Sequence, residues 1–201
     1  MKRRTALCAL TLLPAAALAD TAALQKIFEN IARRRTLCAA FEMERSVPGL
    51  QQPFVSRGRV TIVEGLGLVW RTIQPIEDVI AYGGRSAAKT GDDGQIHISP
   101  SKESHIFTEQ SEAVLSGNLF SLTNRFFADA RVNADGSWLL ILTPKMELIA
   151  SLMSECLLTG AGTIKTAAFY RPDGTVIRIR FDEKRDSVLP LDDVELLYKL
   201  Q

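Results

Sequence analysis

Residues 41–62 read FEMERSVPGLQQPFVSRGRVTI. In the first part, Phe41 and Met43 alternate with charged residues; after a turn-rich break at 47–53, Val60 and Ile62 alternate with polar ones. An alternation with period two is typical of a β-strand whose two faces meet different environments. The stretch therefore predicts two strands of an antiparallel sheet with one apolar face.

The same period continues through most of the chain. Further strands are predicted at 68–73, 79–82, 85–89, 95–98, 126–132, 138–143, 155–158, 163–170, 175–182 and 194–198. Apolar residues at helical spacing predict helices at 21–35, 112–120 and 147–153. Short strands with a minority of helices, and no linker or repeat, indicate a single α+β domain. We expect a strongly curved antiparallel sheet with helices on its concave face.

The first 19 residues have the pattern of a secretory signal peptide. Residues 2–4 are Lys-Arg-Arg, an apolar run follows, and residues 17–19 are Ala-Leu-Ala, which suits a signal peptidase. A membrane anchor is the alternative, but the run is well short of the ~20 residues that span a bilayer. Cys8 does not indicate a lipoprotein, because the bulky Leu7 precedes it. We expect cleavage before Asp20 and a soluble domain, residues 20–201, in the periplasm.

The charge of the mature chain is nearly balanced. Of the 24 Lys and Arg residues, three lie in the signal peptide, which leaves 21 against 23 Asp and Glu. No basic excess favours nucleic acid or an anionic membrane surface as a partner.

Residues typical of catalysis are scarce. His97 and His105 are the only histidines, and no Gly-x-Ser-x-Gly motif accompanies them. The acidic pairs at 92–93 and 192–193 fall in predicted turns, where Asp is favoured for local hydrogen bonding. No phosphate-binding glycine motif is present. We therefore predict no catalytic residue, no metal and no cofactor, and a hydrolase that uses either histidine is the weakest alternative.

Cys38 and Cys156 remain after cleavage. In an oxidising compartment they could form a disulfide, which would contribute about 4–5 kcal/mol in the loop-entropy model. The alternative is two small buried side chains that never meet. Two cysteines without clustered histidines do not make a closed zinc site.

Large apolar side chains recur on one side of the predicted strands and helices. They are Phe41, Met43, Val60, Ile62, Leu68, Trp70, Leu119, Phe120, Phe126, Leu140, Leu142, Ile149, Met153, Phe169, Ile177, Ile179 and Phe181. Each is as consistent with an ordinary core as with a binding site. If curvature leaves a cavity between them, it would suit acyl chains, because each buried methylene contributes about 0.8 kcal/mol.

Seven motifs follow one another between about residues 22 and 182. They are Phe41-x-Met43-x-Arg45, Val47-Pro48-Gly49-Leu50, Pro53-x-Val55-Ser56-x-Gly58, Gly67-x-Val69-Trp70-x-Thr72-x-x-Pro75, Leu115-x-Gly117-Asn118-Leu119, Trp138-x-Leu140-x-Leu142-x-Pro144 and Pro172-Asp173-Gly174-x-x-Ile177-x-Ile179-x-Phe181. No single motif is diagnostic. Their order after a signal peptide resembles the outer-membrane lipoprotein carrier proteins, the LolA-like family, and most closely the branch found beside glycolipid or polyene export systems.

The resemblance implies an incomplete antiparallel β-barrel whose helices cover a hydrophobic cavity. It also implies a periplasmic carrier that works without cofactor or covalent chemistry. Such a carrier accepts an acylated lipoprotein, glycolipid or other lipid from an inner-membrane ABC complex or exporter. It shields the acyl chains and passes the client to an outer-membrane receptor. We expect it to act as a monomer.

The chain departs from the family pattern where the cavity is gated. A glutamine common in the first strand is replaced by Met43, and the gating arginine of a Trp-x-x-Arg-Pro stretch is missing from residues 61–65. Arg45 points with Phe41 toward the apolar side and could anchor a lipid head group or lid carbonyls at the rim. The alternative is an arginine that turns outward to water.

The alternative function of the whole chain is a non-transport binding or assembly module for a membrane exporter.

Overall fold

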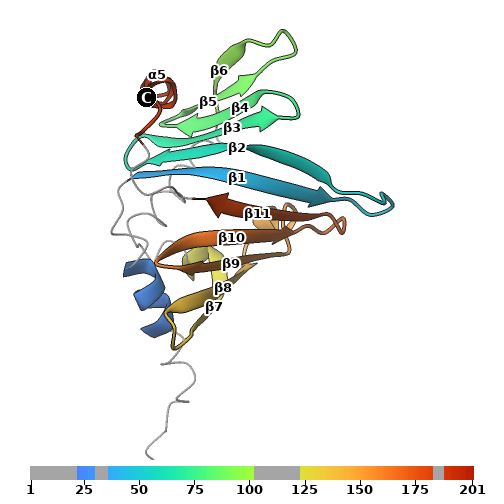
Figure 1. Ribbon diagram of the computed structural model, residues 1–201, viewed down its shortest axis with the longest axis vertical. Helices are drawn as coiled ribbons and strands as arrows, with labels where there is room; N and C mark the ends of the chain where they lie inside the picture. The colour runs from blue at the N-terminus through green and yellow to red at the C-terminus, as the bar shows by residue number, and fades with distance from the viewer. Residues whose placement is uncertain (1–21, 30–35, 102–122, 183–187) are drawn as a thin grey trace, which may run out of the picture.

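The computed structural model describes residues 22–29, 36–101, 123–182 and 188–201. Its strands form one 11-stranded sheet with the order β6-β5-β4-β3-β2-β1-β11-β10-β9-β8-β7 (Figure 1). The strands are β1 (Thr36–Ser46), β2 (Phe54–Val63), β3 (Gly67–Gln74), β4 (Asp78–Gly83), β5 (Ser86–Thr90), β6 (Ile96–Pro100), β7 (Phe126–Val132), β8 (Ser137–Pro144), β9 (Glu155–Ala161), β10 (Thr163–Tyr170) and β11 (Val176–Asp182).

All the strand pairs are antiparallel, and pairing of β1 with β11 joins two meanders into one curved sheet. Within the described residues the sheet is open, because β6 and β7 lie at the two ends of the strand order. The predicted antiparallel sheet is therefore confirmed.

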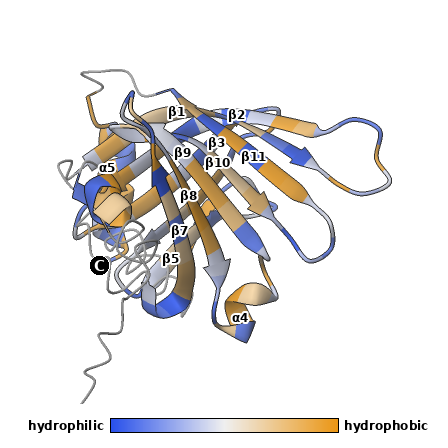
Figure 2. Ribbon diagram, turned by 90° about the horizontal axis from the view of Figure 1, so that it is seen from below, coloured by the Kyte–Doolittle hydropathy of each residue, from blue (hydrophilic) through white to orange (hydrophobic). Residues whose placement is uncertain are grey.

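The cross-strand register separates two faces of the sheet. Phe41 lies opposite Gly58 on β2 and Phe181 on β11, and the next positions on the same side also pair apolar residues, such as Met43 with Ile179. We call this side the apolar face. Because side chains alternate along a strand, Glu42 and its cross-strand partners lie on the opposite face. Hydrophobic and hydrophilic residues accordingly alternate along the strands in Figure 2.

The two longer described helices pack on different faces. The helix over residues 22–29 packs on the apolar face of β7–β9, where Ile27 and Phe28 are buried against Leu140. Helix α5 (Leu191–Lys199) packs on the opposite face of β3–β5, where Leu197 is buried against Val69. The short α4 (Glu147–Ala150) connects β8 to β9. The expectation that helices cover the apolar face is met by only one of these two longer helices.

The strand predicted at 194–198 is wrong, because this segment belongs to α5. Its buried positions are Asp193, Leu196, Leu197 and Leu200, which recur at i, i+3, i+4 and i+7. This is the period of a helix face, but one of the four positions is charged, so the apolar pattern is incomplete in the sequence. The acidic residues of its first turn, Asp192 and Asp193, suit the positive end of the helix dipole.

Several predictions concern residues outside the described ranges. They are the signal peptide at 1–19, the helix at 112–120, and the side chains of His105, Leu119 and Phe120. The helix predicted at 147–153 is confirmed over its first four residues as α4. None of the described helices has both the length and the apolar character needed to cross a bilayer.

Candidate functional site: an apolar pocket beside Trp70

A pocket of about 140 Å³ opens on the apolar face. Eight apolar residues line it: Leu37, Ala39, Val60, Ile62, Leu68, Trp70, Ile164 and Phe181. They come from β1, β2, β3, β10 and β11, and lie toward the end of the sheet at which β2 turns into β3. A pocket with this lining can hold hydrocarbon but offers no side-chain hydrogen bond apart from the indole N–H of Trp70.

Aromatic rings form the floor of the apolar face beside this pocket. Phe41 stacks on Trp70 with ring centroids 4.1 Å apart, and Phe181 meets Trp70 edge-on at 6.4 Å. The stack crosses β2 at Gly58, where an added Cβ would lie 2.9 Å from the Phe41 ring. Gly58 therefore leaves the space that lets Phe41 reach Trp70 from two strands away.

The other half of the apolar face is closed. Trp138 is only 3% exposed and packs under helix 22–29 with Leu140 and Leu142. An added Cβ at Gly160 would lie 2.4 Å from its indole ring, so Gly160 admits the ring as Gly58 admits Phe41. Trp138 Nε1 is buried and has no hydrogen-bond partner among the residues that the structure describes. This region is a hydrophobic core.

The structure distributes the predicted cavity residues over three places. Val60, Ile62, Leu68, Trp70 and Phe181 line the pocket. Phe41, Met43, Phe169, Ile177 and Ile179 belong to a packed cluster in the middle of the face, which also contacts Trp70. Phe126, Leu140, Leu142, Ile149 and Met153 belong to the core under helix 22–29.

Sequence reasoning missed three lining residues. Leu37 and Ala39 extend the alternation of β1 toward its start, so their signal was present but the predicted strand began too late. Ile164 reaches the pocket because the register between β9 and β10 shifts between Ile164 and Thr166. No sequence pattern predicts that shift in register.

Arg45 does not line the pocket. Its guanidinium lies over the exposed Phe54 ring, 5.1 Å from the centroid. Arg45 is eight residues along β1 from Leu37, which corresponds to roughly 26 Å of extended strand. An arginine at that place cannot be the rim of this pocket.

Cys38 and Cys156 are not joined by a disulfide in the structure. Cys38 lies on β1 opposite Thr61, on the face that carries α5, whereas Cys156 is buried in the core on the apolar face. Three strand spacings also separate β1 from β9, about 14 Å, whereas a disulfide requires Cα atoms within about 7 Å. Of the two alternatives for these cysteines, a Cys38–Cys156 disulfide is therefore incompatible with this fold.

A buried carboxylate attaches α5 to the sheet. Asp193 is fully buried and accepts hydrogen bonds from Thr61 Oγ1 at 2.7 Å, from Arg59 Nε at 2.9 Å and from Arg71 Nη2 at 2.8 Å. Burial alone would raise the pKa of this carboxyl, but the hydrogen bonds from Arg59, Thr61 and Arg71 outweigh it and hold the pKa below its usual value. The exposed Asp192 contacts both arginines as well. The pair at 192–193 is thus a structural anchor, not a turn.

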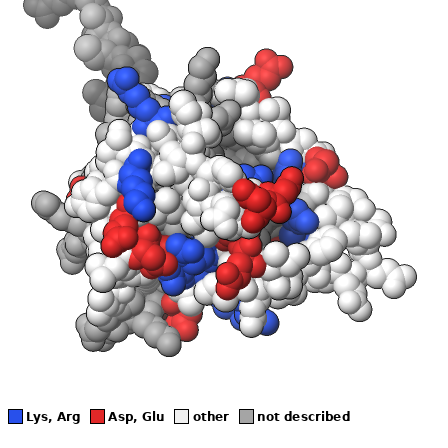
Figure 3. Space-filling view, turned by 90° about the horizontal axis from the view of Figure 1, so that it is seen from above, with Lys and Arg blue, Asp and Glu red and all other residues white. Residues whose placement is uncertain are grey.

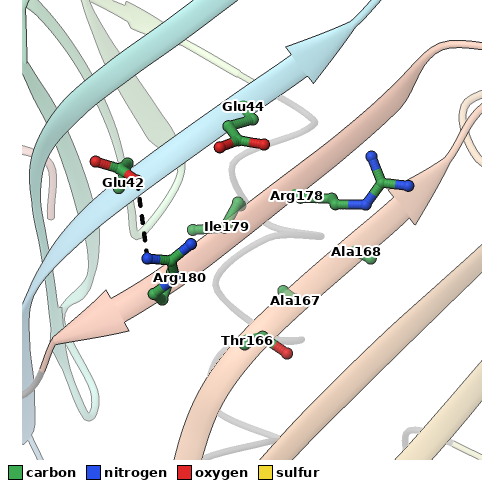
Figure 4. A pocket seen from close by; sticks show the side chains of 8 residues that line it. All are labelled: Glu42, Glu44, Thr166, Ala167, Ala168, Arg178, Ile179 and Arg180. Atoms are coloured by element: carbon green, nitrogen blue, oxygen red, sulfur yellow. Dashed lines mark ion pairs between the residues drawn. The ribbon is translucent and has the colours of Figure 1, made fainter. Parts of the chain in front are cut away.

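Two larger hollows on the opposite face are lined by four charged residues each, together with neutral ones. One, of about 230 Å³, lies over β1, β11 and β10 (Figure 4). There Glu42 pairs with Arg180 at 4.0 Å and, beside the hollow, with Arg57 at 2.8 Å. The other, of about 510 Å³, includes Arg59 and Arg71 beside α5. Acidic and basic side chains are likewise interspersed on the side of the molecule seen in Figure 3. Because both hollows include charged side chains of both signs, they are less suited to an acyl chain than the pocket beside Trp70.

The described histidine lies away from the pocket. His97 bonds Asp93 at 2.9 Å in the exposed β5–β6 hairpin, and its hydrogen bond is the main cause of the lowered pKa of Asp93. Across the described ranges, no group of three or more His, Cys, Asp or Glu residues is placed to hold a metal ion.

No protein-family model and no curated protein matches the chain. Among solved structures, it is similar to a LolA superfamily protein from Nitrosomonas europaea, with 12% identity, a TM-score of 0.44, and coverage of 87% of this chain and 96% of that one. It is also similar to an outer membrane lipoprotein-sorting protein domain from Vibrio parahaemolyticus, with 12% identity, a TM-score of 0.44, and coverage of 89% of this chain and 99% of that one. A third similar structure is that of MucB in complex with MucA from Pseudomonas aeruginosa, with 10% identity, a TM-score of 0.45, and coverage of 90% of this chain and 60% of that one.

Proposed function

We propose that this chain is a periplasmic carrier that holds the apolar tail of a lipid or lipidated molecule on the apolar face of its sheet. The observation that carries the proposal is the pocket beside Trp70, whose eight lining residues are all apolar. Phe41, which stacks on Trp70, extends the apolar surface from the pocket to the middle of the face. A tail transferred there from water is stabilised by roughly 0.8 kcal/mol for each buried methylene.

The size of the pocket limits what it holds. At about 140 Å³ it resembles the ~150 Å³ cavity that takes one benzene ring, and it is smaller than the ~300–1,000 Å³ of most ligand sites. In the proposal, the pocket receives the end of a tail, and the rest of the tail lies along the apolar face.

The cellular role follows from the sequence rather than from the pocket. The signal-peptide pattern and the order of the LolA-like motifs support a carrier between an inner-membrane ABC complex or exporter and an outer-membrane receptor. The client would be an acylated lipoprotein, a glycolipid or another lipid. The chain catalyses no reaction in this proposal; His97 is not among the residues that line the pocket.

A second candidate is a binding or assembly module that carries no lipid. The close packing in the middle of the apolar face favours it, because Phe41, Ala167 and Ile179 are buried there. In that case the chain would be purified with one protein partner and without lipid.

Titration with cis-parinaric acid, a fluorescent fatty acid, tests the first candidate. Ile62→Asp, which places a charge in the pocket, is expected to weaken probe binding at least tenfold. Ile73→Asp on β3 is the matched control, because Ile73 is 47% exposed and lies on the opposite face. Ala39→Leu is a neutral second variant that fills the pocket and is expected to weaken binding several-fold. Wild-type protein that takes up no probe would contradict the proposal, as would equal affinity in all four proteins.

A further inference from the structure

The connection from β8 through α4 to β9 exposes an unusual number of large apolar side chains. Leu148 and Leu152 are 65% and 62% exposed, and Met146 is 47% exposed. Phe127 on the adjacent β7 is 64% exposed, and its ring lies under the amino group of Lys145, the residue that precedes Met146. We call these four side chains the α4 tip.

The tip is not the outer surface of an ordinary amphipathic helix. The inward side chains Ile149 and Met153 already pack against the core under helix 22–29, and two leucines, Leu148 and Leu152, are exposed on the outside beside the polar Glu147 and Ser151. Met146 occupies the N-cap and makes no side-chain cap hydrogen bond, although Ser, Thr, Asp or Asn is strongly preferred there. Local stability does not explain apolar residues at these exposed positions.

Two charged residues, Lys145 and the exposed Glu147, flank Met146 beside the apolar side chains. Lys145 Nζ lies 4.7 Å from the centroid of the Phe127 ring and donates a hydrogen bond to the carbonyl oxygen of Thr123. In the described part of the chain, no carboxylate forms an ion pair with Lys145. An aromatic ring, a lysine and aliphatic side chains in one place match the chemistry of a bilayer interface, where the lysine meets anionic head groups and the apolar groups enter the acyl region.

The shape of the tip also favours a lipid surface. Figure 2 shows α4 projecting beyond the ends of the strands. A projecting apolar knob fits a soft, extended surface, whereas a groove would fit a peptide or a helix. We propose that the α4 tip docks the protein on a lipid bilayer, with Leu148 and Leu152 inserted and Lys145 at the head groups.

This docking surface is separate from the proposed tail-binding pocket. The tip lies at the β7–β9 side of the sheet and shares no residue with the pocket. Each can therefore be disrupted without the other, and the carrier function and bilayer docking can fail independently.

Co-sedimentation with vesicles of phosphatidylethanolamine and phosphatidylglycerol tests the proposal on the full mature chain. The double variant Leu148→Ser/Leu152→Ser is expected to lower the partition coefficient at least tenfold. The matched control is Val188→Ser/Leu191→Ser, which removes two side chains exposed by 88% and 76% before and at the start of α5. That control is expected to bind vesicles like the wild type. Thermal unfolding checks that both variants are folded.

Two further measurements complete the test. Lys145→Glu is expected to weaken binding to these vesicles several-fold but to leave binding to pure phosphatidylcholine vesicles nearly unchanged. Binding of cis-parinaric acid is expected to be the same in the tip variant and the wild type. The proposal is overturned if the wild type binds no vesicles, or if the tip variant binds them as well as the wild type. It is also overturned if the wild type forms a dimer that the tip variant loses, because a second copy would then cover the tip.

Discussion

The two tryptophans lie on the same face of the same sheet, yet they have different environments. Trp138 is sealed under helix 22–29 and is part of a core, whereas Trp70 lines a pocket. Each depends on a nearby glycine for its packing, Gly160 for Trp138 and Gly58 for the stack on Trp70. The strands alone do not explain why Trp138 is buried and Trp70 borders a pocket. The placement of the described helices explains it.

The two halves of the sheet differ in the face on which their helix packs. In the β7–β9 half, a helix covers the apolar face, where its Leu24, Ile27 and Phe28 pack in the hydrophobic core. In the β2–β5 half, α5 packs on the opposite face, where Asp193 bonds Arg59 and Arg71. Among the described elements, no helix covers the apolar face beside Trp70. Among the described elements, therefore, the helix of this half is anchored by charged residues on one side of the sheet and leaves the apolar side uncovered.

The largest expected effect is the loss of that anchor. Asp193→Ala removes the carboxylate that pairs Arg59 and Arg71, and should reduce the free energy of unfolding by about 3–5 kcal/mol, because partly buried charges then lose their partner. Urea denaturation measures the change. Asp192→Ala is the control; its side chain is 58% exposed, and a loss of less than about 1 kcal/mol is expected. Equal losses would mean that the buried carboxylate does not hold α5.

The next largest effect distinguishes apolar residues of the core from apolar residues that line the pocket, by the loss of unfolding free energy on truncation to alanine. Leu140→Ala, in the sealed half, should reduce the free energy of unfolding by about 2–5 kcal/mol, since it leaves a cavity. Leu68→Ala, in the pocket, should cost clearly less, because Leu68 is only half-buried and borders an existing void. Urea denaturation of both variants checks this order. If Leu68→Ala were as destabilising as Leu140→Ala, the Trp70 region would be a core as well.

A smaller effect concerns acid stability. The pKa of Asp193 is lower in the folded chain than its unfolded value of about 3.9, so its ion pairs stabilise the fold fully above about pH 4. That stabilisation is lost as the pH falls through the folded-state pKa. The difference in unfolding free energy between the wild type and Asp193→Asn should therefore shrink below about pH 4. If the difference in unfolding free energy stayed constant from pH 7 to pH 2, the ionised Asp193 carboxylate would not be the source of this stabilisation.

The smallest effect is expected at the cysteines. Burial, with a smaller contribution from the charge of Glu155, raises the pKa of the Cys156 thiol to about 12, so almost no thiolate forms at pH 8. Cys156 should not react with a thiol reagent until the protein unfolds. Cys38→Ser should leave the melting temperature unchanged under oxidising conditions, because no disulfide is lost. A Cys38–Cys156 peptide in a non-reducing digest would contradict the fold itself.

The sequence predicted the sheet better than it predicted the site. The bounds of β7 and β10 agree with their predicted ranges, because period-two alternation reports directly which side chains share a face. Alternation does not report what covers that face, so Trp70 and Trp138 were indistinguishable. Helix α5 was missed because Asp193 occupies a core position of its helical pattern, and its partners Arg59 and Arg71 come from strands more than 120 residues away.

The claim that the apolar face is open at Trp70 and sealed at Trp138 can be tested with single-tryptophan proteins. The chain has two tryptophans, so Trp138→Phe leaves Trp70 as the only indole and Trp70→Phe leaves Trp138. Each is titrated with a fatty acid that carries a bromine or nitroxide quencher near the end of its chain. We predict saturable quenching of Trp70 and little quenching of Trp138. Quenching of Trp138 alone, or of neither tryptophan, would contradict the account.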